Sequence, residues 1–188
     1  MLRDITNIED LALYQFLKDE RTKEAAFKEL YSRHSARIFA YCTRILGSRD
    51  LADDIFQDTF LSFLKSAEQE REMTNVPAFL LRIARNLCLN KKRELRKSYV
   101  SIDDIDLGYN DRTIENREMT DIVVRAMDLL PDEHREAIVM QTYNGMSYNE
   151  IADFCGVPMT TVRNWIARGK RKLKEIIEPY YAVSEKNN

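Results

Sequence analysis

The chain has 188 residues, of which only five are glycine and four are proline. Regular β-sheet proteins need many turns, and turns are built mostly from Gly, Pro and Asn, so these counts favour long helices in one large domain or two small ones. The 29 basic and 31 acidic residues give a formal net charge of −2, which by itself argues against nucleic-acid binding, but charge acts locally and its distribution matters more than its sum.

Membrane, secretory and metal-binding classes are disfavoured. No segment approaches the ~20 consecutive apolar residues of a membrane span, and the N-terminus lacks the apolar core of a secretory signal. Cys42, Cys88 and Cys155 are far apart and form no CxxC pair, which argues against a disulfide framework or a zinc site. We therefore expect a soluble cytoplasmic protein with no metal, no cofactor and no membrane insertion.

The first expected helix is marked by apolar residues that recur at steps of three and four from Phe27 onward, and Gly47 ends it. Ser48 or Asp50 can cap a second helix. The apolar stripe of that helix includes Ile55, Phe56, Phe60, Phe63 and Leu64. The polar stretch 67–75 is expected to be a loop.

Asn75 can cap a third helix, one side of which carries Leu80, Ile83, Ala84 and Leu87. Residues 82–97 hold seven basic residues and one acidic residue. The opposite face carries, at helical spacing, Arg82, Arg85, Asn86, Leu89, Asn90 and Arg93. A basic face beside a polar loop suits single-stranded or melted nucleic acid. Such sites usually supply aromatic side chains for stacking, but the loop before this helix has none and Phe79 is the nearest. A plain solvated surface is therefore an equal alternative for this face.

Residues 99–117 show no sustained period, and 101–121 hold seven acidic residues and two basic ones. We expect a flexible acidic linker there. A helical pattern resumes near Thr120, and a further helix follows Pro131. The expected fold is all-α, with two small helical domains joined by this linker.

Residues 147–173 have the spacing of a helix-turn-helix. Ser147 and Glu150 can form a capping box at the start of a short helix. Ala152 is small enough to let a second helix cross closely, Gly156 suits a positive-φ turn, and Val162 would fill the crossing from the second helix.

The second helix of this motif is polarised. Its buried side carries Val162, Ile166, Gly169 and Leu173, and its other side carries Thr160, Arg163, Asn164, Ala167, Arg168 and Arg171. Arg and Asn read base edges, while Lys and Thr more often hold phosphates. A basic stripe on its own would suggest a solvated face, but together with the motif spacing it predicts DNA binding. Trp165, at the boundary, is expected to pack against the preceding helix.

Four segments in order resemble the bacterial sigma factors of the extracytoplasmic-function group. Residues 26–46 resemble the first helix of that family's second conserved region, and 50–65 resemble its acidic, aromatic-rich helix. Residues 75–97 resemble the helix for promoter melting and minus-10 recognition, and 130–175 resemble the fourth region, which reads the minus-35 element. The linker stands in place of the third region of larger sigma factors.

The resemblance implies a domain of residues 1–98 for core RNA polymerase binding, minus-10 recognition and melting, a linker of residues 99–118, and a minus-35 domain of residues 119–188. The implied minus-35 residues are Thr160, Thr161, Arg163, Asn164, Arg168 and Arg171. The implied minus-10 residues are Arg82, Arg85, Asn86, Asn90 and Arg93. The implied polymerase-binding residues are Asp53, Asp54, Gln57, Asp58 and Phe60. Promoter DNA and core RNA polymerase are the implied partners, and members of the group are often held by an anti-sigma factor.

Two other classes of function compete with this interpretation. A stand-alone helix-turn-helix repressor or activator would explain 119–178 but leaves 22–97 without a role, except as a dimerisation module. An enzyme is disfavoured because His34 and His134 are isolated within helical segments, and because no nucleophile–base set, phosphate-binding Gly loop or Glu-x-x-His pair occurs. We expect a sigma factor with no catalytic role of its own.

Overall fold

The structure is a computed structural model that describes residues 5–69, 72–99 and 122–184, with the backbone alone for 96–99 and 181–184. These residues form helices joined by turns and loops and contain no β-strand, which confirms the all-α fold class. The chain divides into two compact units, Met1–Ile105 and Asp106–Asn188. The expected linker lies outside the described residues, apart from its first residue, Tyr99, which ends a helix.

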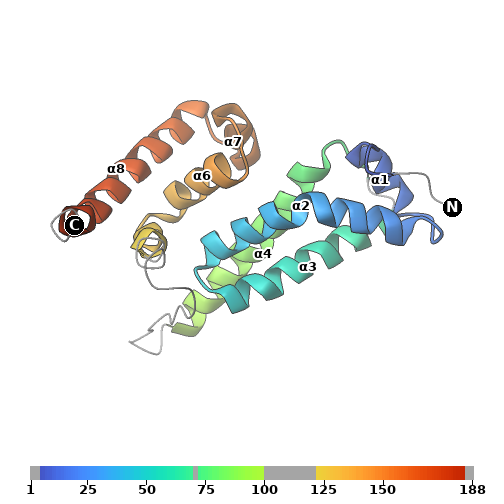
Figure 1. Cartoon of the computed structure of the whole chain (residues 1–188), viewed down its shortest axis with the longest axis horizontal. Coiled ribbons are helices and arrows are strands. Elements are labelled where there is room, and N and C mark those ends of the chain that lie inside the picture. Colours follow the sequence, from blue (N-terminus) through green and yellow to red (C-terminus); the bar gives the residue numbers. More distant parts are fainter. Residues whose placement is uncertain (1–4, 70–71, 100–121, 185–188) are drawn as a thin grey trace. The chain divides into compact units, whose positions relative to one another are not determined.

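The first unit is built from α1 (Asp10–Phe16), α2 (Lys23–Leu46), α3 (Arg49–Glu68) and α4 (Val76–Tyr99) (Figure 1). The three long helices pack against one another, and α1 packs on α2 and also contacts α4. The core between them contains fully buried side chains, among them Tyr14, Leu30, Tyr41, Phe63 and Leu80.

The ends of these helices follow local signals in the sequence. Gly47 adopts a left-handed φ of 68°, and its N–H donates to the Thr43 carbonyl over 3.0 Å, which ends α2. The Ser48 hydroxyl accepts the Leu51 N–H at the start of α3. Asn75 Oδ1 accepts the Ala78 N–H over 2.9 Å at the start of α4. The expected helix end and both caps are confirmed.

Three features of the first unit differ from the expectation. Helix α1 was not predicted, because seven residues are too few for a helical period to stand out among polar neighbours. Helix α3 continues through Ala67 and Glu68, since Ala67 is fully buried and its packing outweighs the polarity around it. On α4 the residue buried after Ala84 is Cys88, whereas Leu87 is only half-buried.

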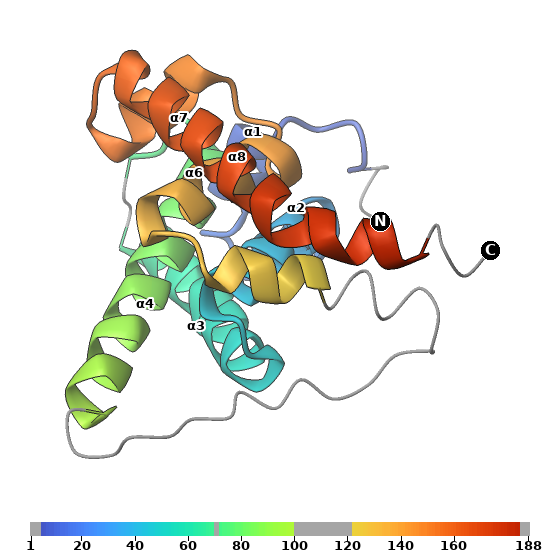
Figure 2. The same ribbon diagram turned by 90° about the vertical axis from the view of Figure 1, so that its left-hand side faces the viewer.

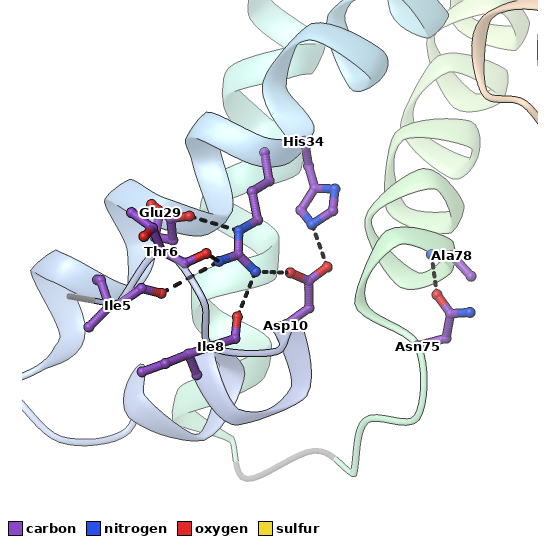
Figure 3. Close-up of polar contacts among 9 residues, drawn as sticks. Ile5, Thr6, Ile8, Asp10, Glu29, His34, Asn75 and Ala78 are labelled. Carbon is purple, nitrogen blue, oxygen red and sulfur yellow. Dashed lines mark hydrogen bonds and ion pairs between the residues drawn. The ribbon is translucent and has the colours of Figure 1, made fainter. Parts of the chain in front are cut away.

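A cluster of polar contacts ties α1 to α2 (Figure 3). The Asp10 carboxylate accepts from Arg33 Nη1 over 2.8 Å, and its second oxygen lies 2.7 Å from His34 Nε2. Arg33 also donates to the backbone carbonyls of Thr6 and Ile8 and to the Glu29 carboxylate. Desolvation by burial lowers the pKa of Arg33, but the hydrogen bonds and charges of Asp10 and Glu29 outweigh it and raise that pKa above its ordinary value. His34 is therefore not isolated, contrary to the sequence analysis. Its partner Asp10 belongs to α1, a helix that was not predicted.

The second unit contains a helical stretch at residues 122–128, followed by α6 (Asp132–Tyr143), α7 (Tyr148–Cys155) and α8 (Met159–Ser184). Helices α6 and α7 both pack on α8 (Figure 2). The core between these helices includes the buried side chains of Val139, Met140, Ile151, Val162 and Ile166.

Helix α8 approaches α6 closely because position 169 has no side chain. A Cβ atom added to Gly169 would lie 2.7 Å from Ile138 Cδ1 and 3.3 Å from His134 Cβ. Glycine inside a helix costs about 0.5–1 kcal/mol relative to alanine. The close approach explains why a glycine occupies the interior of α8, on the side that the sequence pattern predicted to be buried.

A buried arginine joins α6 to the preceding helical stretch. Arg135 is 6% exposed, and its Nε and Nη2 donate to the carbonyls of Met127 and Asp128 over 2.8 and 2.6 Å. Its Nη1 lies 3.0 Å from Asp128 Oδ1. Because the last carbonyls of a helix lack the regular partner four residues on, they can accept these additional donors from Arg135. Nothing in the spacing of the sequence predicted this role.

Candidate nucleic-acid interface

The helix-turn-helix predicted in the second unit is present. The Ser147 N–H donates to Glu150 Oε2 over 2.7 Å and the Glu150 N–H donates to Ser147 Oγ over 3.3 Å, which completes the capping box at the start of α7. Gly156 turns the chain between α7 and α8 with φ 68°. Ala152 and Val162 are both buried where these helices pack together.

The outward side of α8 carries the predicted base-reading residues, which we call the α8 face. Its members are exposed and share one side of the helix: Thr160, Arg163, Asn164, Arg168 and Arg171. Within the described residues, neither Asn164 nor Arg168 makes a hydrogen bond or ion pair, so their donors are available to a ligand. Thr161 is half-buried at the flank of this face, and Trp165 is half-buried at its boundary.

Helix α4 presents a second basic side, which we call the α4 face: Arg82, Asn86, Asn90 and Arg93. All four are exposed, on the side opposite the buried Leu80, Ala84 and Cys88, whereas Arg85 is half-buried at the edge. Arg93 Nη1 donates to Asn90 Oδ1 over 3.2 Å, which holds these two side chains together at the surface. The sequence-predicted residues are therefore gathered on one side, with Arg85 set apart from the others.

The predicted polymerase-binding residues on α3 are divided between surface and core. Asp54, Gln57 and Asp58 are exposed and Asp53 is half-buried. Phe60 is only 3% exposed, and its ring lies 4.9 Å from that of Tyr31 and 5.2 Å from that of Phe56, measured between centroids. Phe60 therefore belongs to the core, because an aromatic side chain on the inner side of α3 gains more from burial than from exposure.

The capping box gives the second unit a dependence on pH. The backbone N–H and the hydroxyl of Ser147 hold the pKa of the Glu150 carboxyl below its ordinary value of 4.5. The ionised carboxylate therefore stabilises the fold fully above about pH 4.5, and the contribution is lost as the pH falls through the lowered, folded-state pKa.

We expect Glu150→Gln to destabilise the second unit at neutral pH and to differ less from the native chain as the pH drops below 4 or so. Urea unfolding followed by the fluorescence of Trp165, the one tryptophan of the chain, measures this. Glu178→Gln, at an exposed position of α8, is the matched control. A Glu150→Gln defect of the same size at every pH would contradict the assignment.

Comparison with known proteins identifies the family. Residues 30–98 match Sigma-70 region 2, and residues 120–173 match Sigma-70, region 4. The chain is 28% identical to the ECF RNA polymerase sigma factor EcfG of Rhodopseudomonas palustris over 144 residues, which cover 73% of this chain and 77% of that protein. The chain belongs to the extracytoplasmic-function (ECF) sigma factors. Its role is therefore in transcription initiation, and the resemblance found in the sequence is confirmed.

Further relatives of this sigma factor agree. It is 28% identical to the RNA polymerase sigma factor CarQ of Myxococcus xanthus over 155 residues, which cover 81% of this chain and 89% of CarQ. Two solved structures share its fold: the sigma factor RpoE in complex with the anti-sigma factor NepR from Bartonella quintana, and CnrH in complex with the cytosolic domain of CnrY. Their TM-scores are 0.65 and 0.67 at 23% and 22% identity, and the matches cover 81% and 90% of this chain and 96% and 97% of the other chains.

The described part of this sigma factor lacks two kinds of feature. Among its helices there, none combines the length and the apolar character needed to cross a bilayer. The same residues contain no group of three or more His, Cys, Asp and Glu side chains that could hold a metal ion.

Proposed function

We propose that this sigma factor binds core RNA polymerase, reads a minus-10 and a minus-35 promoter element with its two domains, and helps to melt the first. Residues 1–98 form the minus-10 domain and residues 119–188 the minus-35 domain in this proposal. The observation that carries it is that each unit has its own core and presents one outward basic helix side, the α4 face or the α8 face. A single-site DNA binder has no use for the second of these.

The α8 face suits the major groove of duplex DNA. It is the second helix of a helix-turn-helix, which is the helix that enters the groove. Arg163, Asn164 and Arg168 have planar donors that match base edges, and Thr160, Thr161 and Arg171 can hold phosphates. We assign the minus-35 element to this face.

The α4 face suits a melted strand. Asn86 and Asn90 can hydrogen-bond the edges of unpaired bases, and Arg82, Arg85 and Arg93 can neutralise the backbone on both sides of them. Residues 72–75 form the loop directly before α4. We assign minus-10 recognition and melting to this face, with Asn86 holding a flipped base.

The remaining surface of α3 suits the polymerase. Asp53, Asp54, Gln57 and Asp58 make this part of α3 acidic and polar, and all but the half-buried Asp53 are exposed. The two sigma factors of similar fold were solved with an anti-sigma factor and with the cytosolic domain of CnrY, and we propose that a comparable inhibitor binds this chain. It would act in the cytoplasm, as a specificity subunit without catalysis of its own.

Transcription with core RNA polymerase and a promoter library tests the proposal. Enrichment of two spaced elements that depends on this chain supports it. Tight binding to a DNA site in the absence of polymerase, with no stimulated initiation, would instead support a stand-alone repressor or activator.

Arg168→Ala is expected to weaken binding to the selected minus-35 element by about 1–3 kcal/mol and to relax the preference at one base pair. The reason is the loss of a bidentate contact with a base edge. Fluorescence anisotropy with the holoenzyme and duplexes substituted at each position measures both effects. Lys172→Ala, at an exposed residue on the flank of α8, is the control and should change all duplexes equally. If Arg168→Ala also weakened the binding of every duplex equally, Arg168 would be assigned to a phosphate contact instead.

A further inference from the structure

Helix α1 lies outside the part of the chain that matches region 2, which begins at residue 30. It is nevertheless part of the first unit, because Leu13, Tyr14 and Leu17 are at most 1% exposed. Seven residues cannot hold a helix in water without tertiary support. The position of α1 is therefore fixed by its tertiary contacts. The side chains of α1 in turn restrain the residues that they pack against.

Two groups of contacts hold α1 in place. At its start, Asp10 is bound by Arg33 and His34 of α2, and Arg33 also holds the carbonyls of Thr6 and Ile8 (Figure 3). Along its buried side, the Tyr14 ring packs against Phe63 of α3, with centroids 5.5 Å apart. The first group fixes α1 on α2, and the second places a rigid ring inside the core.

The contacts continue to α4. The Phe63 ring, which is fully buried, lies 6.3 Å from the ring of Phe79 in the first turn of α4. Phe79 is half-buried and precedes Arg82 and Asn86 by three and seven residues, so it shares their side of the helix. Both ring separations are within the range of attractive aromatic pairs, 4.5–7 Å. Three rings from three helices thus connect α1 to the edge of the α4 face.

We propose that Tyr14 is a positioning residue for promoter melting: through Phe63 it fixes the Phe79 ring beside the α4 face, where an unpaired base would stack. This inference rests on the proposed role of α4. A stacking ring must be held still to gain from contact with a base, because a mobile ring loses conformational entropy on binding. Phe79 is the only aromatic residue among the described residues 64–95, so the stacking role falls to it.

The first experiment measures the ring itself and needs neither DNA nor polymerase. Phe79→Trp combined with Trp165→Phe leaves one tryptophan, at position 79 of the full chain. Adding Tyr14→Leu should raise the acrylamide quenching of that tryptophan toward the value of an exposed one. Tyr14→Phe keeps the ring and should leave quenching unchanged. Tyr41→Leu, the same change at an equally buried tyrosine of α2, is the control and should also leave it unchanged.

The second experiment measures melting with the holoenzyme. Tyr14→Leu should lower open-complex formation on a duplex promoter by about two- to tenfold, as expected for loss of one aromatic pair. On a template already mismatched across the minus-10 element it should act like the native chain, because no melting is needed. Tyr14→Phe should restore duplex melting. If Tyr14→Leu does not fold, the variant Asp10→Asn takes its place in both experiments. That change loosens the start of α1 and removes no side chain from the core.

Unchanged quenching, unchanged duplex melting, equal losses on both templates, or the same effects from Tyr41→Leu would each overturn the inference. The last two would show general damage to the core instead of positioning. If the native chain opens no promoter at all, the proposed function fails, while the quenching comparison still decides whether α1 fixes Phe79.

Discussion

Replacement of Arg135 by alanine is expected to lower the free energy of unfolding of the second unit by about 1.5–3 kcal/mol, the range for hydrogen bonds made by a charged group. The guanidinium is 6% exposed and donates to the carbonyls of Met127 and Asp128 as well as to the Asp128 carboxylate. Its removal takes one donor from each of these three groups and leaves a cavity that the alanine methyl does not fill.

Urea unfolding followed by Trp165 fluorescence measures this effect, since that residue belongs to the second unit. Arg125→Ala, at an exposed arginine of the 122–128 stretch, is the matched control and should change stability by no more than about 0.5 kcal/mol. A loss below about 1 kcal/mol for Arg135→Ala would mean that water replaces the guanidinium at the helix end.

Phe63→Ala is expected to destabilise the first unit by about 3–5 kcal/mol, the range for phenylalanine deleted from a packed core. The side chain is fully buried and lies between the rings of Tyr14 and Phe79, so its loss breaks two aromatic contacts and leaves a cavity shared by three helices.

Thermal unfolding followed by far-ultraviolet circular dichroism measures this loss, while Trp165 fluorescence should report an unchanged second unit. Phe56→Ala is the control: Phe56 is also an α3 aromatic in contact with other rings, but it is half-buried, and its deletion should cost less. Equal losses for the two variants would show that the buried ring of Phe63 contributes no more to the stability of this unit than the half-buried ring of Phe56.

The second unit could be predicted from sequence in detail because its signals are local. The capping box, the positive-φ glycine and the small residue at the crossing lie within sixteen residues, from Ser147 to Val162, and each acts through its own backbone or the next turn. The outward side of α8 followed from helical spacing, since the inward side was set by Val162, Ile166 and Gly169.

Features that depend on distant parts of the chain could not be predicted. Arg135 resembles any surface arginine until the carbonyls of Met127 and Asp128 are placed beside it. For Phe60 the sequence predicted a place in the apolar stripe of α3, and the resemblance implied a place in or near the polymerase-binding surface; its ring packs against Tyr31 of α2. His34 acquired a partner only with α1, whose short length hides it from any periodic analysis.

The glycine at position 169 helps to determine how α8 is positioned against α6. Gly169 lies on the side of α8 opposite Arg168 and Arg171, and any added carbon would meet Ile138 and His134 of α6 at less than ordinary contact distance. A larger residue would therefore force Ile138 to rotate or α8 to shift away from α6, and such a shift would move the donors of the α8 face together with the helix. Base discrimination demands a close angular fit. If the α8 face reads the minus-35 element as proposed, a substitution at Gly169 would change promoter choice without replacing any residue of that face.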